Sequence, residues 1–237
     1  MDLKKYFIVG GTSGIGLELV KLLSERQEAV YVGTRSVPDA VQHQGVQYLA
    51  YDVSTDDSEP AGLPDTLDGL VYCPGSIHLM PLQRLKPEDF IADFNLNLLG
   101  AVRTIKATLK RLRKSPTGAS IVLFSTVAVQ TGMPFHASVA SAKGAVEGLT
   151  RSLAAEFAPR IRVNAIAPSL TDTPLAKDLL STDAKREAAT ERHPLKRIGT
   201  PQEIAQMAAF LLSDEGSWIS GQIISMDGGM GAMRTFR

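Results

Sequence analysis

The sequence predicts an α/β protein in which parallel strands form one sheet with helices on both faces. Short apolar runs, several ending in glycine or proline, alternate with longer segments whose apolar residues recur at helical spacing. Because parallel strands are joined by right-handed crossovers, the intervening helices are expected to cover both faces of the sheet. A length of 237 residues suits one compact domain, and we expect residues 1–237 to form it without internal repeats or linkers.

The first third of the chain predicts four strands and one helix. The apolar runs that predict strands lie at residues 6–11, 29–33, 46–53 and 67–75. Residues 15–26 have apolar side chains at helical spacing and predict a helix between the first two strands. Residues 36–45 and 54–66 are short and rich in proline or polar residues, so we expect irregular structure there.

The rest of the chain continues the alternation. Residues 87–115 predict a long helix with a proline in its first turn, and residues 139–159 predict another that ends at a proline. Residues 201–214 predict a helix that Thr200 caps and Pro201 opens. The remaining predicted strands lie at residues 119–126, 161–168 and 221–229.

Composition argues against several classes of function. The 25 basic and 25 acidic residues balance, so the chain lacks the charge pattern of a protein that binds nucleic acid or anionic membranes. One cysteine cannot form an internal disulfide, and the four histidines lack metal-ligand spacing, so no metal site is predicted. No apolar run has the length of a signal-peptide core or a membrane span, and we expect a cytoplasmic protein.

A glycine-rich turn, "GGTSGIG", joins the first predicted strand to the first helix. Such a turn directs backbone N–H groups and the positive helix end toward a pyrophosphate, while glycines keep side chains out of the way. The G-x-x-x-G-x-G spacing differs from the common dinucleotide fingerprint, and a merely tight loop is the alternative interpretation. The predicted cofactor contacts of this turn are Gly10, Thr12, Ser13, Gly14, Ile15 and Gly16.

The end of the second predicted strand discriminates between the two nicotinamide cofactors. An acidic residue there would accept hydrogen bonds from the adenosine ribose, whereas an arginine would pair with a 2′-phosphate. The sequence has Arg35 and Ser36 at this place and no acid. NADP is therefore favoured over NAD, and the alternative is that Arg35 is an ordinary surface arginine.

Together with later segments, these features make the chain resemble the short-chain dehydrogenase/reductase family over nearly its whole length. Beside the glycine turn, the resemblance is carried by "NLLG", "SIVLFST", "IRVNAIAP", "TDTP", "RIGTPQEIAQMAAFLLSD" and "ISGQIISMDGG". It implies a doubly wound, Rossmann-type sheet of about seven parallel strands with NAD(P) across their carboxyl ends. It also implies a small-molecule substrate and a homotetramer or homodimer.

The resemblance assigns further cofactor contacts. Residues matching Asp52 and Val53 hold the adenine in this family, and the stretch from Pro168 to Thr173 lines the nicotinamide. Residues 174–194 correspond to a mobile segment that folds over the substrate. The remaining contacts implied by the resemblance are Cys73, Pro74 and Gly75 after the fourth strand, Lys143, and Pro168, Ser169, Thr171 and Thr173. The chain departs from the family at Pro74, in a turn that is usually rich in asparagine, and at Ser169, where a glycine is usual.

Similar enzymes use an Asn, Ser, Tyr and Lys for catalysis. Asn97 matches the asparagine that kinks its helix, Thr126 matches the serine, and Lys143 matches the lysine that binds the nicotinamide ribose. Val139 stands where the proton-donating tyrosine is expected. Loss of a general acid ordinarily costs about 10²–10⁴-fold in rate, so ketone reduction by the usual route is not expected.

His136 is a candidate replacement for the missing donor. It precedes Lys143 by seven residues, the spacing at which enoyl reductases similar to this family carry their donor tyrosine. Histidines titrate near physiological pH and are suited to proton donation. The alternative interpretation places His136 in a solvated loop before the helix, with Ser138 as the helix cap.

The sequence therefore predicts an NADP-dependent oxidoreductase with an altered proton donor. An activated carbon–carbon double bond and a carbonyl or alcohol remain open as the reacting group. A non-catalytic NADP-binding sensor or partner subunit is the alternative, although retention of Asn97, Thr126 and Lys143 argues against it. A third interpretation is a protein that uses its two long helices only for assembly.

Overall fold

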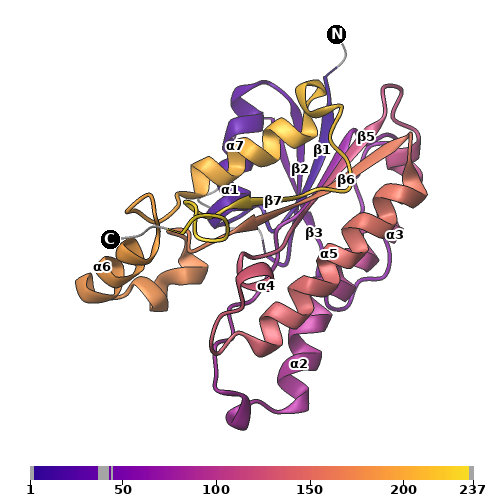
Figure 1. The fold of residues 1–237 in the computed structure, drawn as a ribbon. Coiled ribbons are helices and arrows are strands. Elements are labelled where there is room, and N and C mark those ends of the chain that lie inside the picture. Colours follow the sequence, from indigo (N-terminus) through magenta and orange to yellow (C-terminus); the bar gives the residue numbers. More distant parts are fainter. Residues whose placement is uncertain (1–2, 37–42, 44, 235–237) are drawn as a thin grey trace.

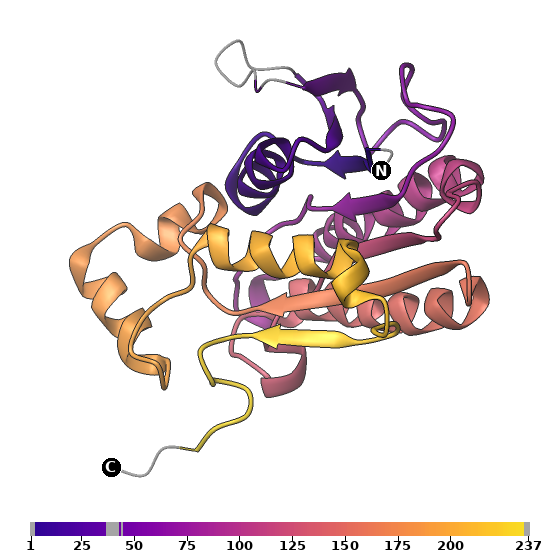
Figure 2. The same ribbon diagram turned by 90° about the horizontal axis from the view of Figure 1, so that it is seen from above.

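A computed structural model describes residues 3–36, 43 and 45–234 of the chain. Within this part, seven parallel strands form one sheet in the order β3-β2-β1-β4-β5-β6-β7 (Figures 1 and 2). The order reverses beside β1, which pairs with β2 on one side and β4 on the other. The predicted doubly wound, Rossmann-type sheet is thus confirmed. The strands span Lys5–Val9, Ala29–Thr34, Val46–Ala50, Gly69–Tyr72, Ala119–Phe124, Ile161–Pro168 and Ile223–Met226.

Helices cover the two faces of the sheet as the alternating pattern predicts. Helices α1 (Gly14–Glu25) and α7 (Pro201–Leu212) pack on one face, and α3 (Gly100–Arg113) and α5 (Ala137–Phe157) lie on the other (Figure 1). Each face has its own apolar core, because side chains of these buried strands alternate between the two faces.

The predicted long helix at residues 87–115 has three parts. Helix α2 (Pro87–Phe94) continues into a π-helical segment, η2 (Asn95–Leu99), and then into α3. A π-helical turn contains one extra residue and is frequent at functional sites. The predicted cap at Thr200 is confirmed, since its hydroxyl accepts from the backbone N–H of Glu203 at 3.3 Å.

The irregular segments are only partly described. Residues 54–66 contain no helix, as predicted, whereas most of the predicted irregular segment 36–45 lies outside the described residues. In residues 174–194, which the family resemblance assigns to a segment over the substrate, the structure has η3 (Pro174–Leu180) and α6 (Asp183–Arg192). The sequence did not indicate the short helices η1 (Leu82–Arg84), α4 (Ala128–Thr131) and η4 (Asp214–Gly216).

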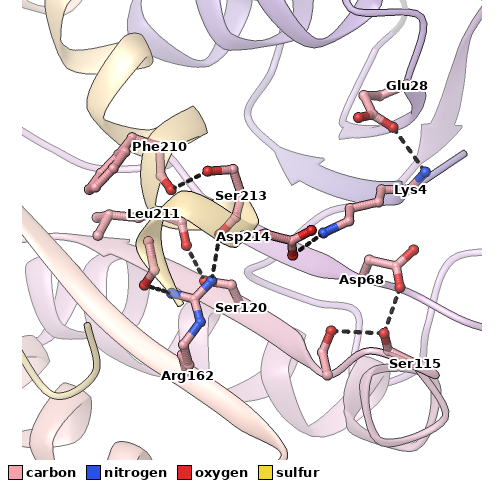
Figure 3. A network of polar contacts seen from close by, with 12 residues as sticks. Lys4, Glu28, Asp68, Ser115, Ser120, Arg162, Phe210, Leu211, Ser213 and Asp214 are labelled. Carbon is pink, nitrogen blue, oxygen red and sulfur yellow. Dashed lines mark hydrogen bonds and ion pairs between the residues drawn. The ribbon is translucent and has the colours of Figure 1, made fainter. Parts of the chain in front are cut away.

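Polar contacts fasten the amino ends of the strands to the end of α7 (Figure 3). The guanidinium of Arg162 donates to the carbonyl of Ser213 at 3.2 Å, and the Ser120 hydroxyl donates to the carbonyl of Leu211 at 2.8 Å. The Lys4 ammonium pairs with Asp214. These bonds satisfy carbonyl groups that the end of a helix leaves without partners. They lie at the amino ends of the strands, opposite the carboxyl ends where the glycine-rich turn lies.

Candidate active site

The glycine-rich turn lies at the carboxyl end of β1 and leads into α1. Gly10 and Gly14 have φ angles of +78° and +52°, which favour glycine. A Cβ on Gly16 would overlap the carbonyl oxygen of Gly10, so this position requires glycine for close packing. Helix α1 begins directly after Ser13, and its first amide groups face the carboxyl edge of the sheet. The strand, glycine-rich turn and helix thus follow one another as the sequence predicts, and anion binding by this turn stays a prediction.

Three loops meet at the reversal of the strand order. A Cβ on Gly10 would lie 3.2 Å from the Pro74 side chain, which follows β4. A Cβ on Gly14 would lie 3.4 Å from the Thr173 side chain, which follows β6. Ligands of open α/β sheets bind at such a reversal, outside the carboxyl ends of the strands. The glycine turn, the Pro74 turn and the Thr173 loop therefore surround one place.

Lys143 reaches this place from α5. Its side chain is buried, at 8% exposure, and its ammonium donates to the carbonyl of Phe124 at 2.9 Å. Burial lowers the pKa of Lys143 to about 8, while interactions with Cys73 and Asp93 act in the opposite direction. Burial raises the pKa of the neighbouring Cys73 thiol to about 12, so this thiol is neutral at physiological pH. The Lys143 ammonium has three N–H donors and gives one of them to the Phe124 carbonyl, so the others are available for a bound ligand.

Asn97 lies in the π-helical segment and faces Lys143 across Gly75. A Cβ on Gly75 would lie 3.2 Å from Asn97 Oδ1 and 3.3 Å from Lys143 Nζ. The amide nitrogen of Asn97 donates to the carbonyl of Asp93 at 2.8 Å and to the hydroxyl of Ser76 at 2.9 Å. The amide oxygen is buried and has no partner. A buried unpaired acceptor is costly, which indicates that a ligand or water satisfies it.

The three remaining candidates at this site precede the lysine in the sequence: Thr126, His136 and Val139. Thr126 is half-buried, and its oxygen accepts from the backbone N–H of Ala128 at 3.3 Å. Val139 is buried on α5, one helical turn before Lys143. His136 occupies the N-cap position of α5, is half-buried, and has Nδ1 2.8 Å from the carbonyl oxygen of Pro134. Among the described residues, no hydrogen bond links Thr126 or His136 to Lys143.

The suggested cap at Ser138 is wrong. The helix begins at Ala137, so Ser138 lies inside the first turn, and its hydroxyl donates to the Asp93 carboxylate at 2.5 Å. The hydroxyl prefers this buried carboxylate to the helix backbone, because the charged acceptor forms the stronger bond. The cap position falls to His136, which makes no side-chain capping bond.

The residues predicted at the adenosine end lie after β2 and β3. Arg35 and Ser36 are exposed directly beyond β2, where the Thr34 hydroxyl donates to the Ser36 carbonyl at 2.8 Å. The Asp52 carboxylate accepts from the hydroxyl and N–H of Ser54, and these bonds hold its pKa below the usual value, with a small contribution from Arg35. Val53 is buried against the adjoining core.

The loop after β6 contains a histidine contact that the sequence did not indicate. His193 is buried at the end of α6, with Nε2 2.9 Å from the Ser169 hydroxyl and Nδ1 2.7 Å from the carbonyl of Ala189. Thr171 and Thr173 donate to the carbonyls of Ser169 and Thr171. The available signal was Ser169, a hydroxyl where similar proteins have glycine. This contact ties residues 174–194 to the loop that includes Pro168.

The fold and the site define a nicotinamide-nucleotide-dependent oxidoreductase. The start of α1 has amide groups without intrahelical partners, and the buried lysine and the unpartnered amide oxygen are polar groups of the kind that bind a sugar and a substrate. A nicotinamide dinucleotide fits these residues. When bound, it supplies or accepts the hydride.

Comparison with known proteins places the chain in the short-chain dehydrogenase/reductase family. Residues 10–231 match a family model described as enoyl-(acyl carrier protein) reductase. The chain is 32% identical over 243 aligned positions to the 3-oxoacyl-[acyl-carrier-protein] reductase FabG of Chlamydia trachomatis, covering 96% of this chain and 97% of the relative. It is 34% identical to cis-4-hydroxycyclohexanecarboxylate dehydrogenase of Sinomonas cyclohexanicum, with 95% and 96% coverage.

Solved structures agree with this assignment. Ligand-free aldohexose dehydrogenase of Thermoplasma acidophilum matches with a TM-score of 0.87 and 25% identity, covering 99% of this chain and 96% of that one. The structure of ElxO with NADP bound matches with a TM-score of 0.86 and 27% identity, covering 98% and 100%. The chain is thus an oxidoreductase of this family that uses a nicotinamide cofactor.

The comparisons give no support to the alternative of a non-catalytic NADP-binding protein, because the matched relatives are named as reductases and dehydrogenases. Within the described residues, no three His, Cys, Asp or Glu side chains gather as metal ligands would. A search of the same residues finds no helix with the length and apolar character that crossing a membrane requires.

Proposed function

We propose that the protein is an NADP-dependent oxidoreductase that transfers hydride between the nicotinamide and a small organic substrate, without a tyrosine proton donor. The observation that carries this proposal is the convergence of Lys143 Nζ and Asn97 Oδ1 over Gly75, where the strand order reverses. We assign catalysis to Asn97, Thr126, Lys143 and His136. We assign cofactor binding to residues 10, 12–16, 35, 36, 52, 53, 73–75, 143, 168, 169, 171 and 173.

NADP is preferred over NAD in this proposal. Arg35 is exposed at the end of β2, where the adenosine ribose of a nucleotide on this sheet edge lies. A guanidinium there forms charge-assisted bonds to a 2′-phosphate. No carboxylate follows β2 at this place to accept from an unphosphorylated ribose. The similar ElxO structure contains NADP, which supports the same choice.

Val139 occupies the position of the usual tyrosine in this proposal. Its isopropyl group is 6% exposed and lies one turn before Lys143 on α5. An aliphatic side chain cannot protonate an oxygen that gains negative charge as hydride is transferred. The reaction therefore needs another donor, or a substrate whose developing charge lies farther from position 139.

His136 is our proposed donor. It is half-buried at the start of α5 and lies one further turn before Val139. A carbonyl oxygen only accepts, so the 2.8 Å contact with Pro134 places a proton on Nδ1. Neutral His136 therefore has an acceptor at Nε2, and only the imidazolium form donates from that atom.

Two substrate classes fit this arrangement. In an activated carbon–carbon double bond, hydride goes to the β-carbon, and the oxygen that becomes an enolate lies farther from the nicotinamide than a ketone oxygen does. The family model named for an enoyl reductase supports this class. The named relatives that act on 3-oxoacyl groups or on a cyclic hydroxy acid support a carbonyl or alcohol.

Turnover assays with purified variants test the proposal. NADPH oxidation is followed with ketones, quinones, enones and enoyl thioesters, and one class is expected to react. The change His136→Ala should reduce that turnover about 10²–10⁴-fold, the range for loss of a general acid, while Ser141→Ala on the exposed face of α5 should not. Val139→Tyr should create or raise ketone reduction. Equal turnover in the His136→Ala variant would remove His136 from the mechanism.

The proposal includes a homodimer or homotetramer of single-domain subunits in the cytoplasm. Ile91 and Leu99, at 58% and 40% exposure, lie along the α2–η2 helix, where a second copy would cover them. Residues 174–194 form the segment that closes over substrate, held to the β6 loop by His193. Light scattering after gel filtration measures the assembly, and a monomer at all concentrations would contradict this part.

A further inference from the structure

A chain of polar side chains, three of them buried and one half-buried, lies beside Lys143 and joins three parts of the fold. It contains Asp93 of α2, Asn97 of η2, Ser76 from the turn after β4, and Ser138 of α5. Asp93 is 3% exposed and Asn97 is 1% exposed. The hydroxyls of Ser76 and Ser138 each donate to one Asp93 carboxylate oxygen, both at 2.5 Å. No motif or periodic pattern in the sequence indicates this cluster.

The direction of the two serine hydrogen bonds in this chain follows from the carboxylate. A carboxylate only accepts hydrogen bonds, so Ser76 spends its one hydroxyl proton on Asp93. Its oxygen can then only accept from Asn97, and the contact of 2.9 Å must involve the amide NH₂ group. The amide nitrogen also donates to the main-chain carbonyl of Asp93 at 2.8 Å. Both bonds turn the amide oxygen of Asn97 the other way, toward the space over Gly75 that Lys143 Nζ also faces.

We propose that Asp93 is a positioning residue, which fixes Asn97 with its amide oxygen as an acceptor beside Lys143 and balances the charge of the buried ammonium. The acceptor holds a hydrogen-bond donor in the site: the Lys143 ammonium, a water molecule or a hydroxyl group. This inference rests on the proposed function only in placing that donor in the cofactor and substrate site.

The charges around Lys143 support the second part of the proposal. Asp93 of α2 and Cys73 of the turn after β4 act electrostatically on the Lys143 ammonium, and the Phe124 carbonyl of β5 accepts a hydrogen bond from it at 2.9 Å. Glu147, one turn later on α5, accepts from Ser125 at 2.7 Å and pairs with Arg151. Asp93 raises the pKa of Lys143 against the effect of burial. Its carboxylate therefore favours the protonated lysine.

Three variants of the nucleotide-free protein distinguish the effect of the Asp93 charge from the effect of the direction of the hydrogen bonds. Asp93→Asn removes the charge and permits the hydrogen-bond chain to reverse. Ser76→Ala interrupts the chain and keeps the charge. Glu88→Gln, at an exposed position on the same helix, is the matched control for loss of one negative charge. NMR of labelled lysine measures the titration of Lys143, and solvent exchange of the Asn97 side-chain amide protons reports whether they stay bonded.

The expected pattern differs among the variants. Asp93→Asn should lower the pKa of Lys143 by about 0.5–1 unit, less than a direct ion pair would shift it, and should speed exchange of the Asn97 amide about tenfold or more. Ser76→Ala should speed the exchange and leave the lysine titration nearly unchanged. Glu88→Gln should change neither. Should Asp93→Asn not fold, the exchange measurement on Ser76→Ala carries the test.

Unchanged Lys143 titration and Asn97 exchange in folded Asp93→Asn would overturn the inference, as would normal exchange in Ser76→Ala. Failure of the wild-type protein to bind NADPH would overturn the proposed function instead, because these measurements need no nucleotide. In an active enzyme, Asp93→Asn should also move the alkaline limb of the kcat/KM profile to lower pH, whereas Ser76→Ala should lower kcat/KM at every pH.

Discussion

At the scale of single residues, the site depends on a lysine that is buried without a direct ion pair. Lys143 keeps one bond, to the Phe124 carbonyl, and no salt bridge joins it to a carboxylate in the described part of the chain. Burial of the ammonium without a close counter-charge costs stability unless the amine loses its proton. The molecule accepts this cost at a position where the proposed mechanism needs a cation.

This cost makes stability depend on pH in a known direction. With the pKa of Lys143 at about 8 in the folded protein and 10.5 as the ordinary value, the unfolded chain binds more protons between these limits. The unfolding free energy of the wild-type protein should therefore rise between pH 8 and 10.5, by roughly 3 kcal/mol relative to that of the Lys143→Met variant. Urea unfolding of both proteins measures the difference. A constant difference across this range would contradict the buried, deprotonating lysine.

Residue-scale prediction from the sequence succeeded where the signal is local. The glycines of the first turn are recognisable because a strand and a helix flank them directly. The Asp93–Ser76–Ser138 contacts were not predictable, because they join segments 17 and 45 residues apart through hydrogen bonds that no periodic pattern records. The same absence of pattern hides the bond from Ser138 to Asp93, so the sequence alone favours a cap at Ser138 that the structure does not have. The roles of His136 and Arg35 stay predictions.

At the scale of elements, the start of α1 and the π-helical segment position the chemistry. Helix α1 can approach β1 closely only because Gly16 has no side chain against the Gly10 carbonyl. The extra residue in η2 interrupts the regular register between α2 and α3, and Asn97 lies inside this segment. The hydrophobic pattern of residues 87–115 predicts the helix, but it does not reveal the irregular turn within it.

Two glycine substitutions compare a position that requires glycine for close packing with one that does not. Gly16→Ala should destabilise the protein by about 1–3 kcal/mol and abolish nucleotide binding, because the new methyl group forces α1 away from β1. Gly148→Ala, at an exposed position of α5 with open space around it, should stabilise by about 0.4–1 kcal/mol. Thermal unfolding and NADPH fluorescence measure both. Normal NADPH binding by Gly16→Ala would show that the close helix–strand approach is not needed.

At the scale of the whole molecule, the two ends of the parallel strands differ. The amino ends are bonded to α7, whereas the proposed site lies at the carboxyl ends. Ser120 and Arg162 tie the amino ends of β5 and β6 to α7 (Figure 3). At the carboxyl ends, the glycine turn follows β1 and Lys143 bonds to the Phe124 carbonyl at the end of β5. The alternating elements predict this sheet, and the family resemblance supplies its strand number. Which residues meet across the reversal depends on tertiary packing, which the sequence pattern does not encode.

Because the α7 contacts and the proposed site lie at opposite ends of the strands, we expect a substitution in these contacts to change stability without changing nucleotide affinity. Arg162→Met removes charged donors from the carbonyls of Ser213 and Gly216 and should cost about 2 kcal/mol of unfolding free energy. Because these bonds lie at the opposite edge from the site, NADPH affinity should stay within about twofold of wild type. Chemical unfolding and nucleotide titration check the two quantities. If Arg162→Met also lost NADPH affinity, the contacts between the amino ends of the strands and α7 would be shown to position the site as well.

Calorimetric titration of the protein with NADPH and NADH tests the central claim most directly. The account predicts a one-to-one complex in which NADPH binds more tightly than NADH, and a loss of affinity of about 10–100-fold in Lys143→Met, the range for a charged hydrogen bond. Equal affinities would contradict the preference assigned to Arg35. No binding heat with either nucleotide, over a range of temperatures, would contradict the placement of a nicotinamide cofactor at the reversal of the sheet.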